Sequence, residues 1–340
     1  MQRWHPIWVA VGALGATAIF AAGSLWLGGF DPLTAAGALV RGSVGSTTAL
    51  FITMTRAVPL ILTGLAVSLA FRAGVWNIGA EGQLYAGAIA AVSVGIAGVG
   101  LPALLLVPLV LGAAALAGAA WAALPAFMRV RLGVGEVITT ILMNFVGIYL
   151  AAYVVSGPLQ EARGVFQQTD PIAEAARLPM LGSGTRLHMG FALAIGVAIA
   201  LWALFRWTRV GFKIRAVGAA PTAARIAGMI PANRVILVSF VASGAIAGLA
   251  GGVEVAGVTY ALYPNLSPGW GYTAIAVALL AGLHPLAIVG TGLLFGALES
   301  GAAAMQREAG IPQAWVSAVV ALVILSVLAA DQIRRRRADD

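Results

Sequence analysis

Long runs without a charged residue alternate with short charged segments along the chain. The charge-free runs are Pro6–Phe30, Gly82–Met128, Val137–Gln160, Leu187–Phe205, Val235–Val253, Val255–Leu298 and Ala309–Ala330. A helix needs about 20 predominantly apolar residues to cross the hydrocarbon core of a bilayer. The pattern therefore predicts an all-α, polytopic membrane protein.

Two of these runs are about twice the length of one span. Leu101-Pro102 interrupts the first of them and His284-Pro285 the second, and proline disfavours continuation of a helix. The shorter run Ala57–Phe71 adds one more span. We expect about ten membrane-crossing helices, including broken or re-entrant segments.

Composition agrees with this class, because 61% of the 340 residues are hydrophobic and 9% are charged, against about a quarter charged in soluble domains. Arg3 followed by an apolar run resembles a secretory signal. The run Pro6–Phe30 is much longer than the roughly 7–15 residues of a signal's apolar region, so an uncleaved first span is expected.

The basic residues predict the orientation. With the N-terminus inside, most of the 20 basic residues lie in cytoplasmic segments, as the positive-inside rule requires. These are Arg3, Arg72, Arg129, Arg131, Arg206, Arg209, Lys213, Arg215, Arg225, Arg234 and Arg334–Arg337. We expect one transmembrane domain over residues 1–340, with both termini cytoplasmic, an outward loop at about 156–188, an inward loop at about 206–234 and a basic tail at 331–340.

Several function classes are disfavoured by what the chain lacks. It has no G-x-x-x-x-G-K-[ST] motif, so no ATP hydrolysis of its own is expected. Its three histidines are far apart in the sequence and form no H-E-x-x-H motif, and it has no cysteine, so no metal or other cofactor is expected on it. The net charge of +8 is spread between apolar spans, which favours a membrane surface over nucleic acid as its partner. A membrane-embedded enzyme is an alternative.

The stretch FRAGVWNIGAEGQLYAGA, which begins at Phe71, places polar residues and glycines after an undersized span. The run Ala57–Phe71 would make a helix of roughly 22 Å, short of the roughly 30 Å core. We predict a broken helix, with one half ending near Phe71 and the other starting near Asn77. Such interruptions mark transport sites, so Trp76, Asn77, Glu81 and Gln83 are candidate substrate-pathway residues. In the alternative, Asn77 caps the second half-helix and Glu81 complements its positive end.

A second interrupted region follows Val253. Glu254, Tyr260 and Tyr263 join the candidate pathway, because an acid between two apolar runs is a functional candidate. The alternatives are an external loop with interfacial aromatic residues, and an ion-paired or helix-end Glu254.

Two polar residues belong to the run that starts after a glycine-rich turn. Asn144 either faces a cavity as part of the pathway or bonds to a neighbouring helix. Glu136 opens the helix, where a carboxylate is stabilising, and we interpret it as structural.

Four motifs together resemble the membrane permease subunit of bacterial ABC importers for nucleosides. They are GVWNIGAEGQLYAGA, GVGEVITTILMNF, GFKIRAVGAAPTAARIAGM and GYTAIAVALLAG. The group is related to the permeases for ribose and simple sugars and for branched-chain amino acids. The resemblance implies an inner-membrane complex with a second homologous permease, ABC ATPase subunits that carry ATP and Mg²⁺, and an extracytoplasmic solute-binding lipoprotein.

The inward loop fits this assembly. Pro221 can start a short helix and Gly228 can end it, and such a helix could dock on the ATPase. The predicted coupling residues are Lys213, Arg215, Pro221, Ala224, Arg225 and Gly228. The alternative is an amphipathic helix on anionic lipid.

The sequence thus predicts a permease that imports a small polar solute, and its resemblance implies a solute of the nucleoside class. A simple-sugar or branched-chain amino-acid permease is an alternative. So is a stand-alone proton-coupled transporter with Glu81, Glu136 or Glu254 as the proton carrier.

Overall fold

The computed structural model describes residues 15, 19–20, 22–182, 184–228, 230–312, 315, 318, 321–322 and 325, without the side chains of residues 225, 227 and 228. Most of the two predicted spans Pro6–Phe30 and Ala309–Ala330, and the whole tail 331–340, lie outside these residues or are described only in part.

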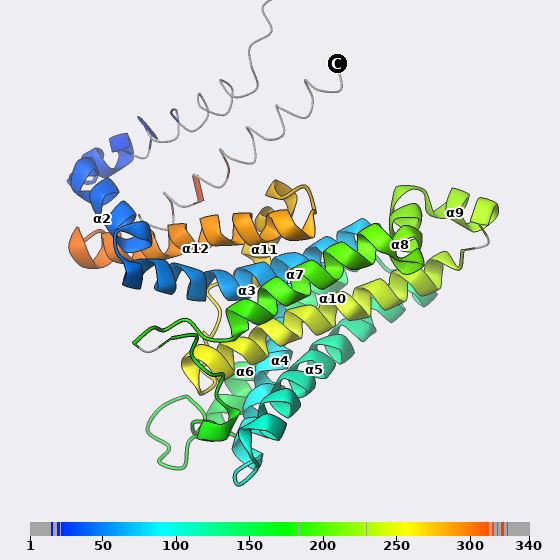
Figure 1. Cartoon of the computed structure of the whole chain (residues 1–340), viewed down its shortest axis with the longest axis horizontal. Helices are drawn as coiled ribbons and strands as arrows, with labels where there is room; N and C mark the ends of the chain where they lie inside the picture. The colour runs from blue at the N-terminus through cyan, green and yellow to red at the C-terminus, as the bar shows by residue number, and fades with distance from the viewer. Residues whose placement is uncertain are drawn as a thin grey trace, which may run out of the picture. The chain divides into compact units, whose positions relative to one another are not determined.

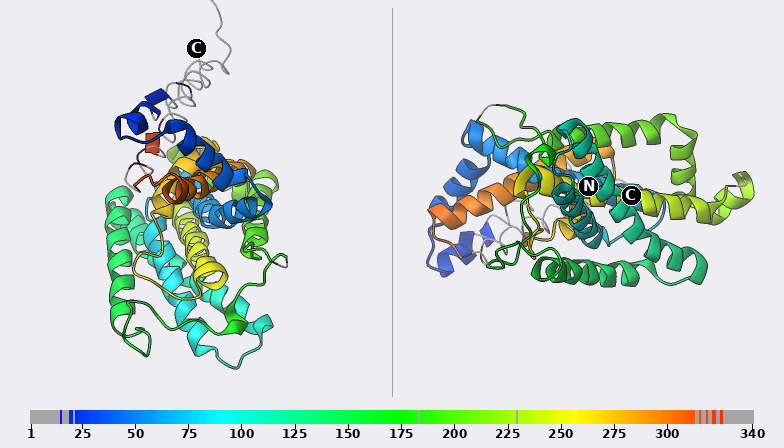
Figure 2. Two further views of the ribbon diagram at one scale, coloured as in Figure 1. Left: turned by 90° about the vertical axis from the view of Figure 1, so that its left-hand side faces the viewer. Right: turned by 90° about the horizontal axis from the view of Figure 1, so that it is seen from below.

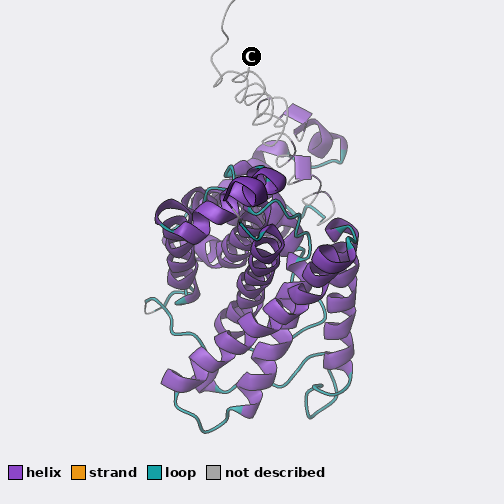
Figure 3. Cartoon of the chain, turned by 90° about the vertical axis from the view of Figure 1, so that its right-hand side faces the viewer, coloured by secondary structure: helices purple, strands orange, loops and turns teal. Residues whose placement is uncertain are grey.

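The described residues form helices joined by loops, and they contain no β-strand (Figure 3). The α-helices are α2 (Pro32–Val44), α3 (Thr47–Arg72), α4 (Ala80–Ala97), α5 (Ala103–Leu132), α6 (Glu136–Ser156), α7 (Gly190–Trp207), α8 (Arg209–Ala219), α9 (Pro221–Gly228), α10 (Ala232–Glu254), α11 (Trp270–Leu280) and α12 (Pro285–Glu308). A 3₁₀ turn, η1 (Glu174–Ala176), lies in the long loop after α6, and a π-helical turn, η2 (Val255–Thr259), extends α10. The predicted all-α class is confirmed.

Seven of the described helices are long and apolar enough to cross a bilayer: α3, α4, α5, α6, α7, α10 with η2, and α12. The shorter α11 is also apolar. The protein is a multi-pass membrane protein, as predicted.

Both proline interruptions fall where the sequence predicts them. Helix α4 ends at Ala97 and Pro102 is the N-cap of α5. Helix α11 ends at Leu280 and α12 begins at Pro285. Proline suits a helix start because its missing N–H has no intrahelical partner there.

The predicted start of the undersized span, at Ala57, is wrong. Helix α3 continues back through Arg56 to Thr47, so it has 26 residues and a length of roughly 39 Å. Arg56 is accommodated inside the helix because its guanidinium donates to the carbonyl oxygen of Glu299 at 3.3 Å. A charged residue does not mark a helix end where it finds such a partner.

The chain divides into two compact units. Unit 1 comprises the residues up to Ala57 and those from Leu293 onward. Its described core contains Leu25, Ala35, Ala38, Met305 and Ile311. Asp31 caps α2 by accepting hydrogen bonds from the backbone of Leu33 and Thr34, and from the Thr34 hydroxyl. These bonds, above all the one from the hydroxyl, lower the pKa of Asp31.

Unit 2, from Val58 to Gly292, is built around α4, α5 and α10, which pack against one another (Figures 1 and 2). Small residues allow the backbones of these helices to touch, as is common between membrane helices. A Cβ added to Gly118 of α5 would lie 2.2 Å from the carbonyl oxygen of Gly244. A Cβ on Gly248 would lie 2.4 Å from the carbonyl oxygen of Ala114.

The two ends of unit 2 differ. At one end, α8 and α9 follow α7 and lead into α10, and we call this the basic end (Figure 1). At the other end, the loop of residues 157–189 bonds to the ends of α4 and η2, through Ala173 N–H to Gly95 and Ile172 N–H to Tyr260. We call this the loop end.

Candidate transport and coupling sites

The predicted helix break is present. Helix α3 ends at Arg72 and α4 begins at Ala80, three residues later than expected. The seven residues between them contain Gly74 at a φ of 76°, in the left-handed region. Val75 packs into a core cluster with Ala122 and Phe240, from α5 and α10. Helices α5 and α10 therefore hold the break inside unit 2.

Asn77 is not the N-cap of α4, because Gly79 occupies that position. The side chain of Asn77 instead makes four hydrogen bonds and is fully buried. It accepts from Gly79 N–H at 2.9 Å and from Gln83 Nε2 at 3.0 Å, and it donates to Gln83 Oε1 at 3.0 Å and Ser243 Oγ at 2.9 Å. Ser243 donates to the carbonyl oxygen of Ala66. This amide cluster ties the break to α3 and α10.

Asn144 holds the break from the side of α6. Its Oδ1 accepts from Gly82 N–H at 2.8 Å, and its Nδ2 donates to the carbonyl oxygen of Ile78 at 2.9 Å. The first N–H groups of a helix have no intrahelical acceptor, so Asn144 supplies one. Of the two predicted roles for Asn144, the structure shows the bond to a neighbouring helix.

Glu81 lies where the first turns of two helices meet. Its Oε2 accepts from Gly271 N–H of α11 at 2.6 Å, while its own backbone belongs to the first turn of α4. Only 1% of Glu81 is exposed. Both helix N-termini carry partial positive charge, which favours a carboxylate between them. A Cβ on Gly271 would lie 2.2 Å from Glu81 N, so glycine is needed for this approach.

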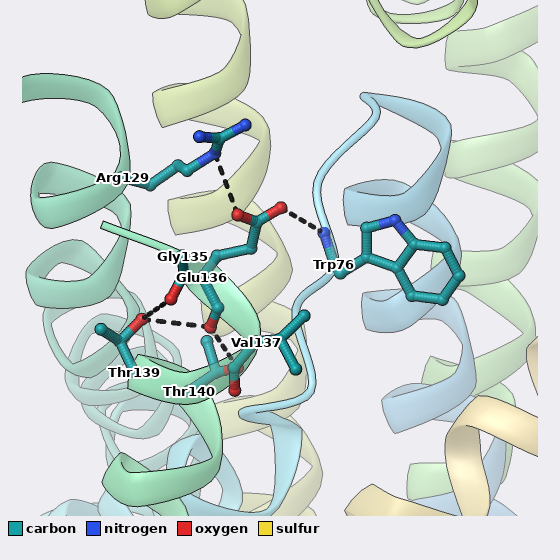
Figure 4. Close-up of polar contacts among 7 residues, drawn as sticks. All are labelled: Trp76, Arg129, Gly135, Glu136, Val137, Thr139 and Thr140. Atoms are coloured by element: carbon teal, nitrogen blue, oxygen red, sulfur yellow. Dashed lines mark hydrogen bonds and ion pairs between the residues drawn. The ribbon is translucent and has the colours of Figure 1, made fainter. Parts of the chain in front are cut away.

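Trp76 is the accessible member of the predicted group, with 53% of its surface exposed. Its ring lies 4.8 Å from that of Phe71, centroid to centroid. Its backbone N–H donates to Glu136 Oε1 at 3.4 Å, and Glu136 Oε2 pairs with Arg129 Nε at 2.9 Å (Figure 4). Glu136 opens α6, as predicted, and also connects the end of α5 to the break.

The second interrupted region meets the first through residues that the sequence analysis missed. Besides the bond between Glu81 and Gly271, the hydroxyl of Tyr85 accepts from Ser267 N–H at 3.2 Å. Tyr85 follows Glu81 by one helical turn, which is a spacing that could have suggested a shared face. The missed partner Ser243 has no comparable signal, since only the fold brings α10 to the break.

The other predicted pathway residues lie at the loop end. Glu254 ends α10 just before the π-helical turn η2 and is buried. Tyr260 has a positive φ of 56°, and the guanidinium of Arg177 lies 4.6 Å from its ring centroid. Tyr263 is 38% exposed. These three residues do not join the amide cluster.

The predicted short helix in the inward loop is present as α9, which begins at Pro221 and ends at Gly228. Ala224 packs against the cluster of Val217, Ile230 and Ala232 at the base of α10. The outward residue that the sequence analysis missed is Ile226, which is 76% exposed. Only the backbone of Arg225 and Gly228 is described.

Two separate hollows are lined by different members of the predicted coupling set. One, of about 260 Å³, lies between α9 and the start of α10 and is lined by Pro221, Thr222, Asn233 and Ile236 among others. The other, of about 480 Å³, lies where α7 meets α8, and Lys213 and Arg215 line it.

Helix α8 contacts the helix break directly through its backbone. A Cβ on Gly218 would lie 2.1 Å from the carbonyl oxygen of Arg72 and 3.1 Å from Gly74 N. Arg72 itself lies over the ring of Phe205, near the end of α7, at 4.7 Å. The loop that carries α8 and α9 is therefore in contact with the start of the break.

Comparison with known proteins places this architecture in a family. Residues 49–328 match the family described as branched-chain amino acid transport system / permease component. The chain is 38% identical to the glucose ABC transporter permease protein TsgB13 of Haloferax volcanii, over 99% of this chain and 92% of that protein. It is 39% identical to the guanosine ABC transporter permease protein NupP of Bacillus subtilis, over 92% and 91%.

A further relative is the nucleoside ABC transporter permease protein NupB of Lactococcus lactis, 32% identical over 88% of this chain and 84% of that protein. No solved structure matches the chain. The predicted resemblance to ABC permeases, and the expectation of a transport subunit rather than an enzyme, are confirmed. The chain belongs to the family of branched-chain amino acid transport system permease components, as a membrane subunit of an ABC transporter.

Proposed function

We propose that this chain is the permease subunit of an ABC importer that moves a nucleoside into the cell, with ATP hydrolysed on a partner subunit. The observation that carries the proposal is the backbone contact between Gly218 of α8 and the residues that begin the helix break, Arg72 and Gly74. This contact links α8, which is followed by the proposed docking helix α9, to the helix break, which is the proposed transport segment.

The docking side of the proposal is α9. Ile226 stands exposed on it, while Ala224 anchors it to the base of α10. The hollow between α9 and α10 adds a concave surface beside the helix. A short anchored helix with an exposed apolar residue fits a cleft on an ATPase subunit.

Movement of α9 can reach the break through α8. Because Gly218 touches the carbonyl of Arg72 without an intervening side chain, a rigid shift of α8 displaces residues 73–79. The amide cluster of Asn77, Gln83 and Ser243 would transmit that shift to α10. Packed elements respond to such shifts as units rather than by continuous deformation.

The solute side of the proposal rests on the accessible Trp76. An aromatic ring can stack on a nucleobase. Asn77, Gln83 and Asn144 are buried, so we assign them to positioning Trp76 and the break, and Glu81 to holding α4 against α11. Glu254, Tyr260 and Tyr263 would then belong to an entrance at the loop end.

The partners follow from the class of transporter. We propose an ABC ATPase that carries ATP and Mg²⁺, a solute-binding protein outside, and a second homologous permease. The guanosine permeases NupP and NupQ of one bacterium both match this chain, at 39% and 28% identity, which supports a permease pair. The basic end would face the cytoplasm with both termini, because positive residues favour that side.

Glucose is the second candidate solute, because the relative TsgB13 bears that name and matches nearly the full chain. The family membership argues against a proton-coupled transporter and against a membrane-embedded enzyme.

The test is uptake of radiolabelled guanosine and glucose by cells with and without the gene. We expect deletion to abolish guanosine uptake that depends on ATP, and the intact gene to restore it. Trp76→Ala should reduce guanosine uptake at unchanged expression, whereas Tyr149→Ala, a change at another exposed aromatic residue, should not. Loss of glucose uptake alone would replace nucleoside by sugar as the solute.

The docking step has its own test. Ile226→Glu should reduce co-purification of the ATPase, and Leu132→Glu, at an exposed apolar residue that ends α5, serves as the matched control. Full ATPase recovery with Ile226→Glu would count against α9 as the docking helix.

A further inference from the structure

The hollow of about 480 Å³ at the junction of α7 and α8 is distinct from the one beside α9. Six of its lining residues carry the argument: Arg206, Trp207, Arg209, Phe212, Lys213 and Arg215. Four of these are cations and two are aromatic. Neither the amide cluster nor the proposed docking of α9 uses them.

The four cations have no acidic partner in the described part of the chain. Elsewhere, Arg129 pairs with Glu136 and Arg41 with Glu308. Four unneutralised cations around one hollow repel one another and create a positive potential that attracts an anion.

The backbone adds to this potential. Helix α8 begins beside the hollow, and Thr208 caps it by accepting from Gly211 N–H at 3.0 Å. The N-terminus of a helix carries partial positive charge. The cations and the helix end therefore favour the same ligand, a compact anion such as a phosphate group.

The aromatic residues indicate where that phosphate comes from. Trp207 ends the apolar helix α7, is 70% exposed, and packs edge-on against Trp202 at 4.7 Å between centroids. Phe212 is also exposed. Tryptophan at the end of a membrane span marks the level of the lipid headgroups, and basic hollows at that level suit anionic headgroups.

We propose that this hollow binds the headgroup of an anionic phospholipid, with its phosphate among Arg206, Arg209, Lys213 and Arg215 and its acyl chains beside Trp207. Lys213 and Arg215 then contact lipid rather than the ATPase. A lipid held here would steady α8, which touches the helix break through Gly218. The inference does not depend on which solute is carried.

The test uses the full chain in phosphatidylcholine vesicles that contain a small fraction of brominated phosphatidylglycerol or, in parallel, brominated phosphatidylcholine. Bromine quenches nearby tryptophan fluorescence, and subtracting a Trp207→Phe sample isolates the signal of Trp207. We expect stronger quenching by the anionic lipid. Each charge removed from the hollow should lower the relative affinity about fivefold, since a basic residue near an anionic surface contributes about one kcal/mol.

Arg209→Gln/Lys213→Gln should therefore lower the preference about 25-fold, and the single variant Lys213→Gln should lower it about fivefold if the double variant fails to fold. Arg131→Gln, which removes one exposed charge at the end of α5, should leave the preference intact. Equal quenching of the unmodified chain by both lipids, or an undiminished preference in both hollow variants, would overturn the proposal. Loss of the preference in millimolar inorganic phosphate would identify a soluble anion as the ligand instead. If the hollow variants instead lose co-purification of the ATPase while their lipid preference is unchanged, the hollow is a docking site for protein.

Discussion

The polar residues of the helix break and those of α8 are used in opposite ways. At the break, Asn77 and Asn144 are buried and their side-chain amides bond to neighbouring amides, a hydroxyl or the backbone. On α8, Arg209, Lys213 and Arg215 line an open hollow, with no acidic partner in the part of the chain that the structure describes.

The difference follows from the solvent at each place. Inside a bundle that crosses a bilayer, an unsatisfied polar group costs several kcal/mol, so the side chains serve the interrupted backbone. At the membrane surface a charge remains solvated and is available to a partner. Burial and partners, rather than residue type, therefore separate residues that maintain the architecture from residues that recognise something else.

Removing the central amide of the break tests this comparison most severely. Asn77→Ala deletes four side-chain hydrogen bonds and removes the partners of the buried Gln83 amide and of Gly79 N–H. Since an unsatisfied buried group costs about 1–3 kcal/mol, we expect the free energy of unfolding to fall by about 3 kcal/mol or more. The measurement is thermal unfolding of the purified chain in detergent.

Asn233→Ala is the control, because Asn233 is exposed near the start of α10. It should change stability by less than about 0.5 kcal/mol. Equal stability of the two variants would mean that the amide cluster does not hold the break.

The contact between the two regions gives the next test. Gly218→Val places a side chain against the carbonyl of Arg72, and overpacking of this kind costs about 1–3 kcal/mol. We expect lower stability, and at permissive temperature reduced uptake with the ATPase still bound. Gly196→Val is the matched control, since a Cβ on Gly196 meets nothing within 4 Å. Normal uptake with Gly218→Val would remove this contact from the coupling route.

The helix ends and the position of the break could be predicted from the sequence, because they depend on local chemistry. Pro102 and Pro285 mark helix starts, and Pro221 and Gly228 mark the ends of α9. Glycines and polar residues after Phe71 locate the break within three residues. These signals work because proline and glycine restrict or release the backbone of the segment that contains them.

The partners of the polar side chains could not be predicted, because they depend on tertiary contacts. The charge on Arg56 predicts that a span begins after it, but a carbonyl from α12 accommodates Arg56 within α3. The position of Asn77 allows a helix cap, but Ser243 of α10 and Gln83 of α4 bond to its amide. Glu81 meets Gly271, which is 190 residues away. The sequence predicts which residues need partners, whereas the fold decides which partners they have.

His188 is a buried polar residue with one unpaired ring nitrogen, and its effect on stability should depend on pH. Its Nδ1 accepts from Gly190 N–H at 3.1 Å, but its Nε2 has no hydrogen-bond partner among the described residues. Burial lowers the pKa of His188 from 6.5 to about 4. Between these values the unfolded chain binds a proton that the folded chain does not, so stability falls as the pH drops below about 6.5.

The expected loss is about 2 kcal/mol between pH 6.5 and pH 5, since one pKa unit corresponds to about 1.4 kcal/mol. Thermal unfolding across this range measures it. His188→Gln should flatten the pH dependence, whereas His284→Gln, at an exposed histidine between α11 and α12, should preserve it. A steep acid dependence that persists in His188→Gln would assign the effect to other groups.

The ion pair of Arg129 and Glu136 is intermediate in exposure between the buried amides of the break and the exposed cations of α8. We expect its removal to have the smallest effect on stability. The oxygen and nitrogen are 2.9 Å apart, but 43% of the Arg129 side chain is exposed and only 11% of the Glu136 side chain. Solvent at the arginine weakens the attraction, so a double-mutant cycle with Arg129→Gln and Glu136→Gln should give a coupling of about 0.5 kcal/mol. That coupling should shrink in high salt, because exposed charges are screened. Glu136→Gln alone should remain mild, since a glutamine can still accept from Trp76 N–H at the start of the break. A coupling of several kcal/mol that salt does not weaken would place this pair with the buried amides, as part of the support of the break, rather than between the two regions.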